Sequence, residues 1–198
     1  MQYLVEQYDP KHLISYPKGS RESYEVNNWL FFLNAGVGPM QVRRTKPVAD
    51  LLHSLLTENC TKGQANHFHR YAPEKIEYGI NRYQNETKRL YGVLDKHLAE
   101  SSSGYLVGNK CTIADISHWG WVTAAGWAGV DINAFPNLKA WDDRMLARPA
   151  VERGRHVPDP HRIKELLADK EAAEKHARES AKWVQQGQAE DAKRFEKK

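Results

Sequence analysis

The 198 residues are 40% hydrophobic and 27% charged, which is the composition of a folded globular protein and excludes the disordered and collagen-like classes. The formal net charge is +4, but no dense basic stripe with interleaved aromatic residues occurs, so nucleic acid is not an expected partner. The two cysteines, Cys60 and Cys111, are too few for a disulfide framework and indicate a reducing compartment. Because the sequence has neither a long apolar run nor a signal-peptide pattern, we expect a cytoplasmic protein without membrane contacts.

The first predicted element is a helix over 1–9, in which Leu4, Val5 and Tyr8 share one side. No capping residue precedes it, although domains usually begin with a loop or a signalled helix start. This abrupt start is typical of a chain with further residues upstream, and we expect such residues here.

A second helix is predicted over about 21–35. Ser20 is a suitable N-cap, because its hydroxyl can accept a hydrogen bond from the first helical turn. Gly36 and Gly38-Pro39 are strong helix-ending signals.

The clearest helical pattern follows Pro73, which suits the first turn of a helix. Apolar residues then recur at steps of three and four over some seven turns. They are Ile76, Ile80, Tyr83, Leu90, Leu94 and Leu98, and Thr87 stands at the same spacing between them. Gly79 and Gly92 lower the helix propensity, and close approach of a neighbouring helix is a reasonable explanation for both.

Residues 112–115 form a capping box in which Thr112 and Asp115 can bond to each other's backbone amide. Cys111 and Ile116 stand where a hydrophobic staple would close the start of the helix, which predicts that the thiol is buried and inert. Asp115 is therefore predicted to have a folding role and no catalytic one. The helix that follows is apolar on nearly all sides as far as Trp127, so we expect it to be the core helix.

One more core helix is predicted before Pro149, with inward-facing Leu138, Trp141, Met145 and Leu146. The remainder of the chain, 161–198, is rich in both acidic and basic residues. We interpret it as a solvated, charged C-terminal helix, with Trp183 as a candidate contact to the body. No β-hairpin signal occurs, so the fold class is all-α.

At this point the sequence resembles a known family. A Leu-x-Gly turn (106–108) before the capping box resembles the C-terminal domain of glutathione transferases. The stretches "NNWLFFLNAGVGPM", "GQANHFHRYAPEKIEYGINRYQNETKRLYGVLDKHL" and "YLVGNKCTIADISHWGWV" are similar to its Ure2-like group. The resemblance covers 1–41 and 63–160. It implies a helical C-terminal domain over 20–160, with 1–9 as the last helix of a thioredoxin-like domain.

Residues 42–62 do not fit this resemblance, because in the Ure2-like group the "GPM" turn runs almost directly into "GQ" and "HF". We interpret 42–62 as an insertion and consider two origins for it. A retained intron is one hypothesis, since Val42-Arg43 can be encoded by GTACGT and Lys62 by a codon that ends in AG. A genuine extra helix after Pro47, with an apolar stripe, is the other.

The resemblance also implies site residues. In the family the helix over 21–35 lines the substrate cleft, so Trp29 and Phe32 are candidates for a hydrophobic substrate pocket, with core packing as the alternative. Arg82 matches an arginine that reaches across a homodimer to a carboxylate of glutathione, which suits a guanidinium. The alternative for Arg82 is an ion pair with Glu86 on the same helix.

No catalytic residue is assigned to this chain, because the group that holds the glutathione thiolate belongs to the thioredoxin-like domain of the family. No metal is expected, since His67 and His69 without a nearby carboxylate or thiol make a poor site. The implied function is a glutathione transferase that conjugates small electrophiles or reduces disulfides with glutathione, with little activity expected from the chain as it stands. A non-catalytic interaction module is the alternative.

Overall fold

The computed structural model describes residues 1–38, 64–157 and 160–196. The described residues form helices and turns without a β-strand, which confirms the all-α prediction. The insertion at 42–62, and Cys60 within it, lie outside the described residues. The helices are α1 (Gln2–Tyr8), α2 (Arg21–Phe32), α5 (Gln64–Asn66), α6 (Glu77–Glu100), α7 (Ile113–Val122), α8 (Pro136–Leu146), α9 (Pro149–Gly154), α10 (Ile163–Ala168) and α11 (Lys170–Glu196).

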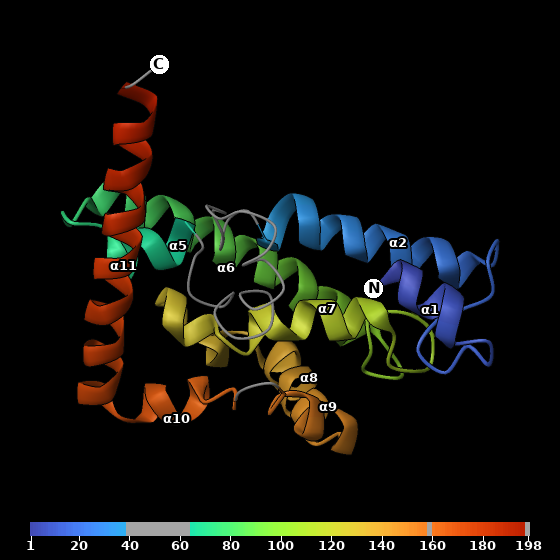
Figure 1. Ribbon diagram of the computed structural model, residues 1–198. Coiled ribbons are helices and arrows are strands. Elements are labelled where there is room, and N and C mark those ends of the chain that lie inside the picture. The colour runs from blue at the N-terminus through green and yellow to red at the C-terminus, as the bar shows by residue number, and fades with distance from the viewer. Residues whose placement is uncertain (39–63, 158–159, 197–198) are drawn as a thin grey trace.

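Helix α2 begins where the sequence predicts. The Ser20 hydroxyl accepts a hydrogen bond from the backbone N–H of Ser23 at 3.2 Å, which satisfies one of the first helical amides. The α-helix ends at Phe32, but the chain continues in a π-helical segment, η1 (Leu33–Val37), so the helical region reaches slightly beyond the predicted boundary. In Figure 1, α2 lies alongside α7, against which it packs.

Helix α6 is the longest helix of the bundle core, and the predicted seam is buried over most of its length. Ile76 is an exception, since it stands at the N-cap position and is 45% exposed. Gly79 confirms the close approach, because a Cβ atom there would stand 2.6 Å from Cδ1 of Phe68. At Gly92 the prediction is wrong for the described residues, since none of their atoms would lie within 4 Å of an added Cβ.

Helix α7 is the buried core helix, and its capping box is present as predicted. The apolar pattern continues to Trp127, yet the α-helix ends at Val122, and Trp127 lies instead on a 3-10 turn, η4 (Ala125–Ala128). That turn ends at Gly129, whose φ of 75° is a left-handed conformation that only glycine adopts at little cost. A second 3-10 turn, η5 (Ile132–Ala134), leads into α8, which buries Leu138, Trp141 and Met145 and half-buries Leu146.

The C-terminal region contains two helices where the sequence indicates one. Asp169 separates α10 from α11, and its carboxylate accepts a hydrogen bond from the N–H of Ala172 at 3.0 Å, as an N-cap does. Helix α11 is also less solvated than expected, because Ala173 and Ala177 are buried in a second apolar cluster. Trp183, the predicted contact residue, is half-buried.

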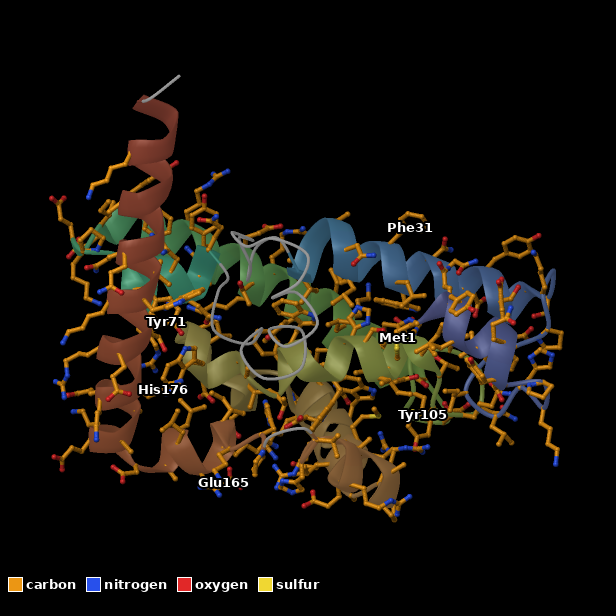
Figure 2. The ribbon with its side chains drawn as sticks, in the orientation of Figure 1. Met1, Phe31, Tyr71, Tyr105, Glu165 and His176 are labelled. Atoms are coloured by element: carbon orange, nitrogen blue, oxygen red, sulfur yellow. The ribbon has the colours of Figure 1, made fainter. Side chains whose placement is uncertain are left out.

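The second apolar cluster joins α11 to the end of the bundle. It contains Tyr71, from the π-helical segment η3 (His67–Tyr71) that follows α5, together with Trp127. Figure 2 shows Tyr71 and His176 where α11 crosses this end of the molecule. Trp127 donates a hydrogen bond from Nε1 to the Tyr71 hydroxyl at 2.5 Å, so the indole is both buried and hydrogen-bonded.

Helix α1 lies beside the first half of α2 and is tied to it by a hydrogen bond from Nε2 of Gln2 to Oδ1 of Asn27 at 2.6 Å. Val5 packs against the main core, whereas Tyr3, Leu4 and Tyr8 are all more than half exposed. The predicted helix is therefore confirmed, and its origin in a thioredoxin-like domain stays a prediction. Among the described helices, none combines the length and apolar character that a membrane span requires.

Candidate functional site

The predicted substrate-pocket residues, Trp29 and Phe32, lie next to each other on α2. Their ring centroids are 5.4 Å apart and the rings meet edge to face. Both side chains are half-buried and pack against the main core, so the core-packing alternative and a pocket wall are each compatible with their position. Trp29 also lines a surface cleft that lies between α2, the end of α6 and the loop that follows α6.

Two histidines surround this aromatic pair. The ring centroid of His97, on α6, is 4.5 Å from that of Trp29. The ring centroid of His118, on α7, is 6.1 Å from that of Trp29 and 6.3 Å from that of Phe32. The resulting group of four rings connects α2, α6 and α7, and two of the four, Trp29 and His97, line the cleft.

His97 and His118 are held in different ways. The His97 Nε2 atom lies 2.7 Å from the backbone carbonyl of Leu106, which fixes the ring against the loop after α6. The His118 Nδ1 atom lies 2.8 Å from the carbonyl oxygen of Ala114, and the ring is fully buried. Burial lowers the pKa of His118 to about 4, although the hydrogen bond to Ala114 opposes the shift, so the ring is neutral at physiological pH.

Arg82, the predicted glutathione-binding residue, lies in the second turn of α6 with an exposed side chain. It borders a surface depression together with Tyr78, Asn81 and Asn85. Fifteen positions along α6 separate Arg82 from His97, which corresponds to about 22 Å at 1.5 Å per residue. The chain therefore does not bring Arg82 and the Trp29–Phe32 pair into one site.

The alternative of an Arg82–Glu86 ion pair is not what the structure contains. Glu86 instead binds Arg89 through two hydrogen bonds of 2.8 and 2.9 Å. These hydrogen bonds lower the pKa of Glu86, and the charges of Arg89 and Arg82 add to the effect. Because Glu86 is engaged by Arg89, the Arg82 guanidinium makes no hydrogen bond to a described residue and remains able to bind a carboxylate.

Asp115 has the folding role that the sequence predicts, and it is fully buried. Its carboxylate accepts hydrogen bonds from the backbone N–H and the hydroxyl of Thr112 at 2.9 and 3.1 Å, as in the predicted box. It also accepts from the backbone N–H of Leu106 and from Nε1 of Trp141, each at 2.9 Å. All these partners belong to the protein, so Asp115 is not available to a substrate.

Within the described residues, Cys111 lies in the core and the histidine-rich stretch 67–69 contacts α6. Cys111 is buried, and burial raises the pKa of its thiol to about 12, which suppresses the reactive thiolate. His69 lies 3.4 Å from Nε2 of Gln84 through its Nδ1 atom. Within the described parts of the chain, no three His, Cys, Asp or Glu side chains are grouped as metal ligands would be.

His97 and His118 are residues of this region that the sequence analysis did not single out, and His118 is the fully buried one. The signal was present, because His118 lies in the largely apolar stretch "IADISHWGWV", where a histidine is expected to be buried. Its packing against Trp29 and Phe32 could not be derived, since that contact joins α2 to α7 across more than eighty residues of sequence.

Comparisons with known proteins agree with this architecture. The family model described as "Glutathione S-transferase, C-terminal domain" matches residues 61–153. The chain is 36% identical over 165 residues to the glutathione S-transferase-like protein tpcF of Aspergillus fumigatus, covering 78% of this chain and 64% of that protein. It is 37% identical over 132 residues to the disulfide-bond oxidoreductase YfcG of Escherichia coli, covering 67% of this chain and 51% of that protein.

A solved structure shows the same helical arrangement. It is that of the glutathione transferase URE2P6 from Phanerochaete chrysosporium in complex with oxidized glutathione, with a TM-score of 0.63 at 32% identity. The match covers 77% of this chain and 61% of that one, so the chain spans less than two thirds of the length of these relatives. With its all-helical fold, its capping box and these matches, the chain belongs to the glutathione S-transferase family, among its Ure2-like members.

Proposed function

We propose that this protein works in glutathione-dependent chemistry, either the conjugation of glutathione to small electrophiles or the reduction of disulfides by glutathione. The observation that carries the proposal is the exposed Arg82 guanidinium, which makes no hydrogen bond to a described residue because Glu86 is bound to Arg89. A guanidinium in this state can bind a carboxylate of glutathione through two parallel hydrogen bonds. Relatives named as transferase-like and as disulfide-bond oxidoreductase support both versions of the chemistry.

In this proposal, residues of the chain contribute to two separate sites, one for the electrophile and one for glutathione. Trp29 and Phe32 form the apolar wall for the electrophile, and Arg82 holds glutathione at a neighbouring subunit of a homodimer, because it lies too far along α6 to serve the same pocket. No catalytic side chain is assigned in the chain itself. Stabilisation of the glutathione thiolate is the part of the chemistry that the thioredoxin-like domain of the family would supply, in the cytoplasm where glutathione is reduced.

Binding to immobilised glutathione tests the proposal most directly. The 198-residue chain and its Arg82→Ala variant would be compared, with Lys88→Ala as a matched control on the exposed side of the same helix. We expect retention of the wild type and the control, and at least a tenfold loss of affinity for Arg82→Ala, because charge-assisted bidentate pairs are the strong ones. Equal retention of all three, or retention of none, would contradict the assignment. Conjugation and disulfide-reduction assays on a form that also carries the thioredoxin-like domain separate the two versions, since little activity is expected from the 198-residue chain itself.

A non-catalytic interaction module is the second candidate, and one observation favours it. Several apolar side chains of α1 and α2 are unusually exposed, among them Tyr8 at 76%, Phe31 at 71% and Tyr24 at 61%. Figure 2 shows Phe31 on the outer side of α2, away from the bundle. Exposed apolar residues of this size are typical of a surface that another protein covers. A chain that forms a stable dimer in sedimentation experiments, yet neither binds nor turns over glutathione, would support the module.

A further inference from the structure

A cavity of about 370 Å³ lies between the end of α7, the turn η5, helix α8 and helix α10. Its apolar lining includes Val122, Val130, Ile132 and Leu167, and its polar lining includes Asp142 and Lys164. It shares no lining residue with the cleft beside Trp29 or with the depression at Arg82, so it is a separate feature of the fold.

Asp142 brings an unpaired hydrogen-bond acceptor to this cavity. Its side chain is only 2% exposed, and its Oδ2 atom accepts a hydrogen bond from Nζ of Lys164 at 2.7 Å. Its Oδ1 atom is buried and has no hydrogen-bond partner among the described residues. A buried carboxylate oxygen without a donor is costly. Because Asp142 lines the cavity, a donor bound there would supply the missing partner.

Lys164 places donors beside that acceptor. Its ammonium group has three N–H bonds, and one of them is engaged by Asp142. The Lys164 side chain is 34% exposed and also lines the cavity, so the other N–H bonds can be directed to a bound molecule. The cavity therefore offers an acceptor and donors next to each other, together with apolar side chains.

We propose that this cavity binds a small neutral compound that carries a primary carboxamide group on an apolar body. The amide N–H of such a compound donates to Oδ1 of Asp142, and its carbonyl oxygen accepts a hydrogen bond from the Lys164 ammonium group. The apolar body packs against the aliphatic side chains of the lining, where it is removed from water. Neither Trp29 nor Arg82 takes part, so the inference is independent of the glutathione-dependent function.

The charges around the cavity disfavour ionic ligands. Asp142 is already paired with Lys164, so a cation at Oδ1 would stand beside an ammonium group. An anion would be attracted by Lys164 but would bring its own acceptors toward the lone pairs of Oδ1. Of the other charged lining residues, Lys139 is paired with Asp143, and Asp131 is exposed to solvent, which screens its charge. A neutral amide satisfies both members of the Asp142–Lys164 pair without either cost.

Four probes of similar size test the inference with the wild-type chain. Benzamide, acetophenone, benzoate and benzylamine carry an amide, a carbonyl without a donor, an anion and a cation on the same ring. Nuclear magnetic resonance titrations would measure each dissociation constant, and shifted signals in α10 and η5 would locate the binding. A hydrogen bond to a charged acceptor corresponds to about a tenfold or greater preference for benzamide over acetophenone. Equal or absent binding of these two, tighter binding of benzoate or benzylamine, or benzamide shifts confined to other helices would each overturn the inference.

A variant of Asp142 separates the acceptor from the shape of the cavity. Asp142→Asn keeps an oxygen for Lys164 and places an N–H donor where Oδ1 stood, so we expect it to lose the preference for benzamide and to bind acetophenone at least as well as the wild type does. Asp143→Asn is the matched control, since Asp143 is the exposed neighbour on α8, and it should leave both dissociation constants unchanged. A preference for benzamide that persists in Asp142→Asn would overturn the inference. Thermal unfolding shows whether each variant is folded, and if Asp142→Asn is not, the wild-type titrations still decide the question.

Discussion

The Asp115 carboxylate accepts a hydrogen bond from the indole Nε1 of Trp141 at 2.9 Å, and both residues are fully buried. This contact joins the start of α7 to the middle of α8, two helices that pack against each other. The same carboxylate also closes the capping box with Thr112 and binds the backbone of Leu106. Asp115 therefore caps α7 and at the same time connects α7 to α8.

Asp115→Ala is expected to be strongly destabilising. It leaves several buried donors of Thr112, Leu106 and Trp141 unsatisfied, and each such group costs about 1–3 kcal/mol, so we expect a loss of at least about 3 kcal/mol. Urea unfolding measures the change in the free energy of unfolding. Asp143→Ala is the matched control, since Asp143 is an exposed residue paired with Lys139, for which we expect less than about 1 kcal/mol. Similar losses in the two variants would contradict the central role of Asp115.

A partly buried ion pair holds α10 against α8. Nζ of Lys164 lies 2.7 Å from Oδ2 of Asp142, and the Asp142 side chain is only 2% exposed. Lys164→Ala would leave this carboxylate buried without a counter-charge; because the lysine is itself a third exposed, we expect a loss of about 2–3 kcal/mol. Faster hydrogen exchange confined to α10, with Lys182→Ala unchanged, is the expected signature. The double variant Asp142→Leu/Lys164→Leu should recover most of the stability, and failure to recover it would show that the lysine acts by another route.

His118 makes the stability depend on pH in a defined direction. Its pKa is about 4 in the folded chain and 6.5 as the ordinary value, so the unfolded chain takes up the proton first as the pH falls. The folded state therefore loses stability progressively between about pH 6.5 and pH 4, by about 3 kcal/mol for a shift of this size, and no further below that range. The difference in unfolding free energy between the wild type and His118→Phe, measured by urea unfolding from pH 8 to pH 4, isolates this contribution from other groups. A difference that does not change with pH would show that the imidazole is not buried in its neutral form.

Features that depend on residues close together in the sequence could be predicted, whereas features that depend on contacts between distant segments could not. The capping box at Thr112 and Asp115 spans four residues, and the seam of α6 repeats every three or four, so both could be derived from spacing. The π-helical continuation after Phe32 and the end of α7 at Val122 depend on packing that no local pattern reveals.

The same distinction between local patterns and long-range contacts applies to the candidate site. Trp29, Phe32 and Arg82 were found through a family resemblance, and the structure places them on two helices without joining them. The ring contacts of His118 and the pair of Asp142 with Lys164 were not predicted, because each depends on helices that meet only in the folded chain. A polar residue in an apolar stretch indicates that the position is buried, but the sequence does not show which residues of other helices it contacts.

The insertion at 42–62 leads to a prediction about the flanking helices. The π-helical segment η1 before it and helix α5 after it both pack directly on α6, so the described core has contacts on both sides of the insertion. We expect a chain in which Gln41 is joined to Gly63 to keep the helical circular-dichroism spectrum and to unfold at the same or a higher temperature, since a shorter connection costs less closure entropy. A lower unfolding temperature would show that 42–62 contributes packing of its own and would favour a genuine extra helix. Sequencing of full-length transcripts then decides whether cells make the joined form, as the retained-intron hypothesis requires.

The docking of α11 is the remaining prediction. Trp127 contacts both the Arg70 guanidinium, whose carbon is 4.2 Å from the ring centroid, and the His176 imidazole of α11, whose centroid is 5.5 Å away. Ala177 is buried in the same cluster, so Ala177→Glu would place a charge among apolar side chains and is expected to detach α11. Limited proteolysis should then cut within α11 while the bundle survives, with Lys175→Glu as the exposed control on the same helix. If Ala177→Glu instead unfolded the whole chain in one transition with α6 and α7, α11 would be an integral part of the core.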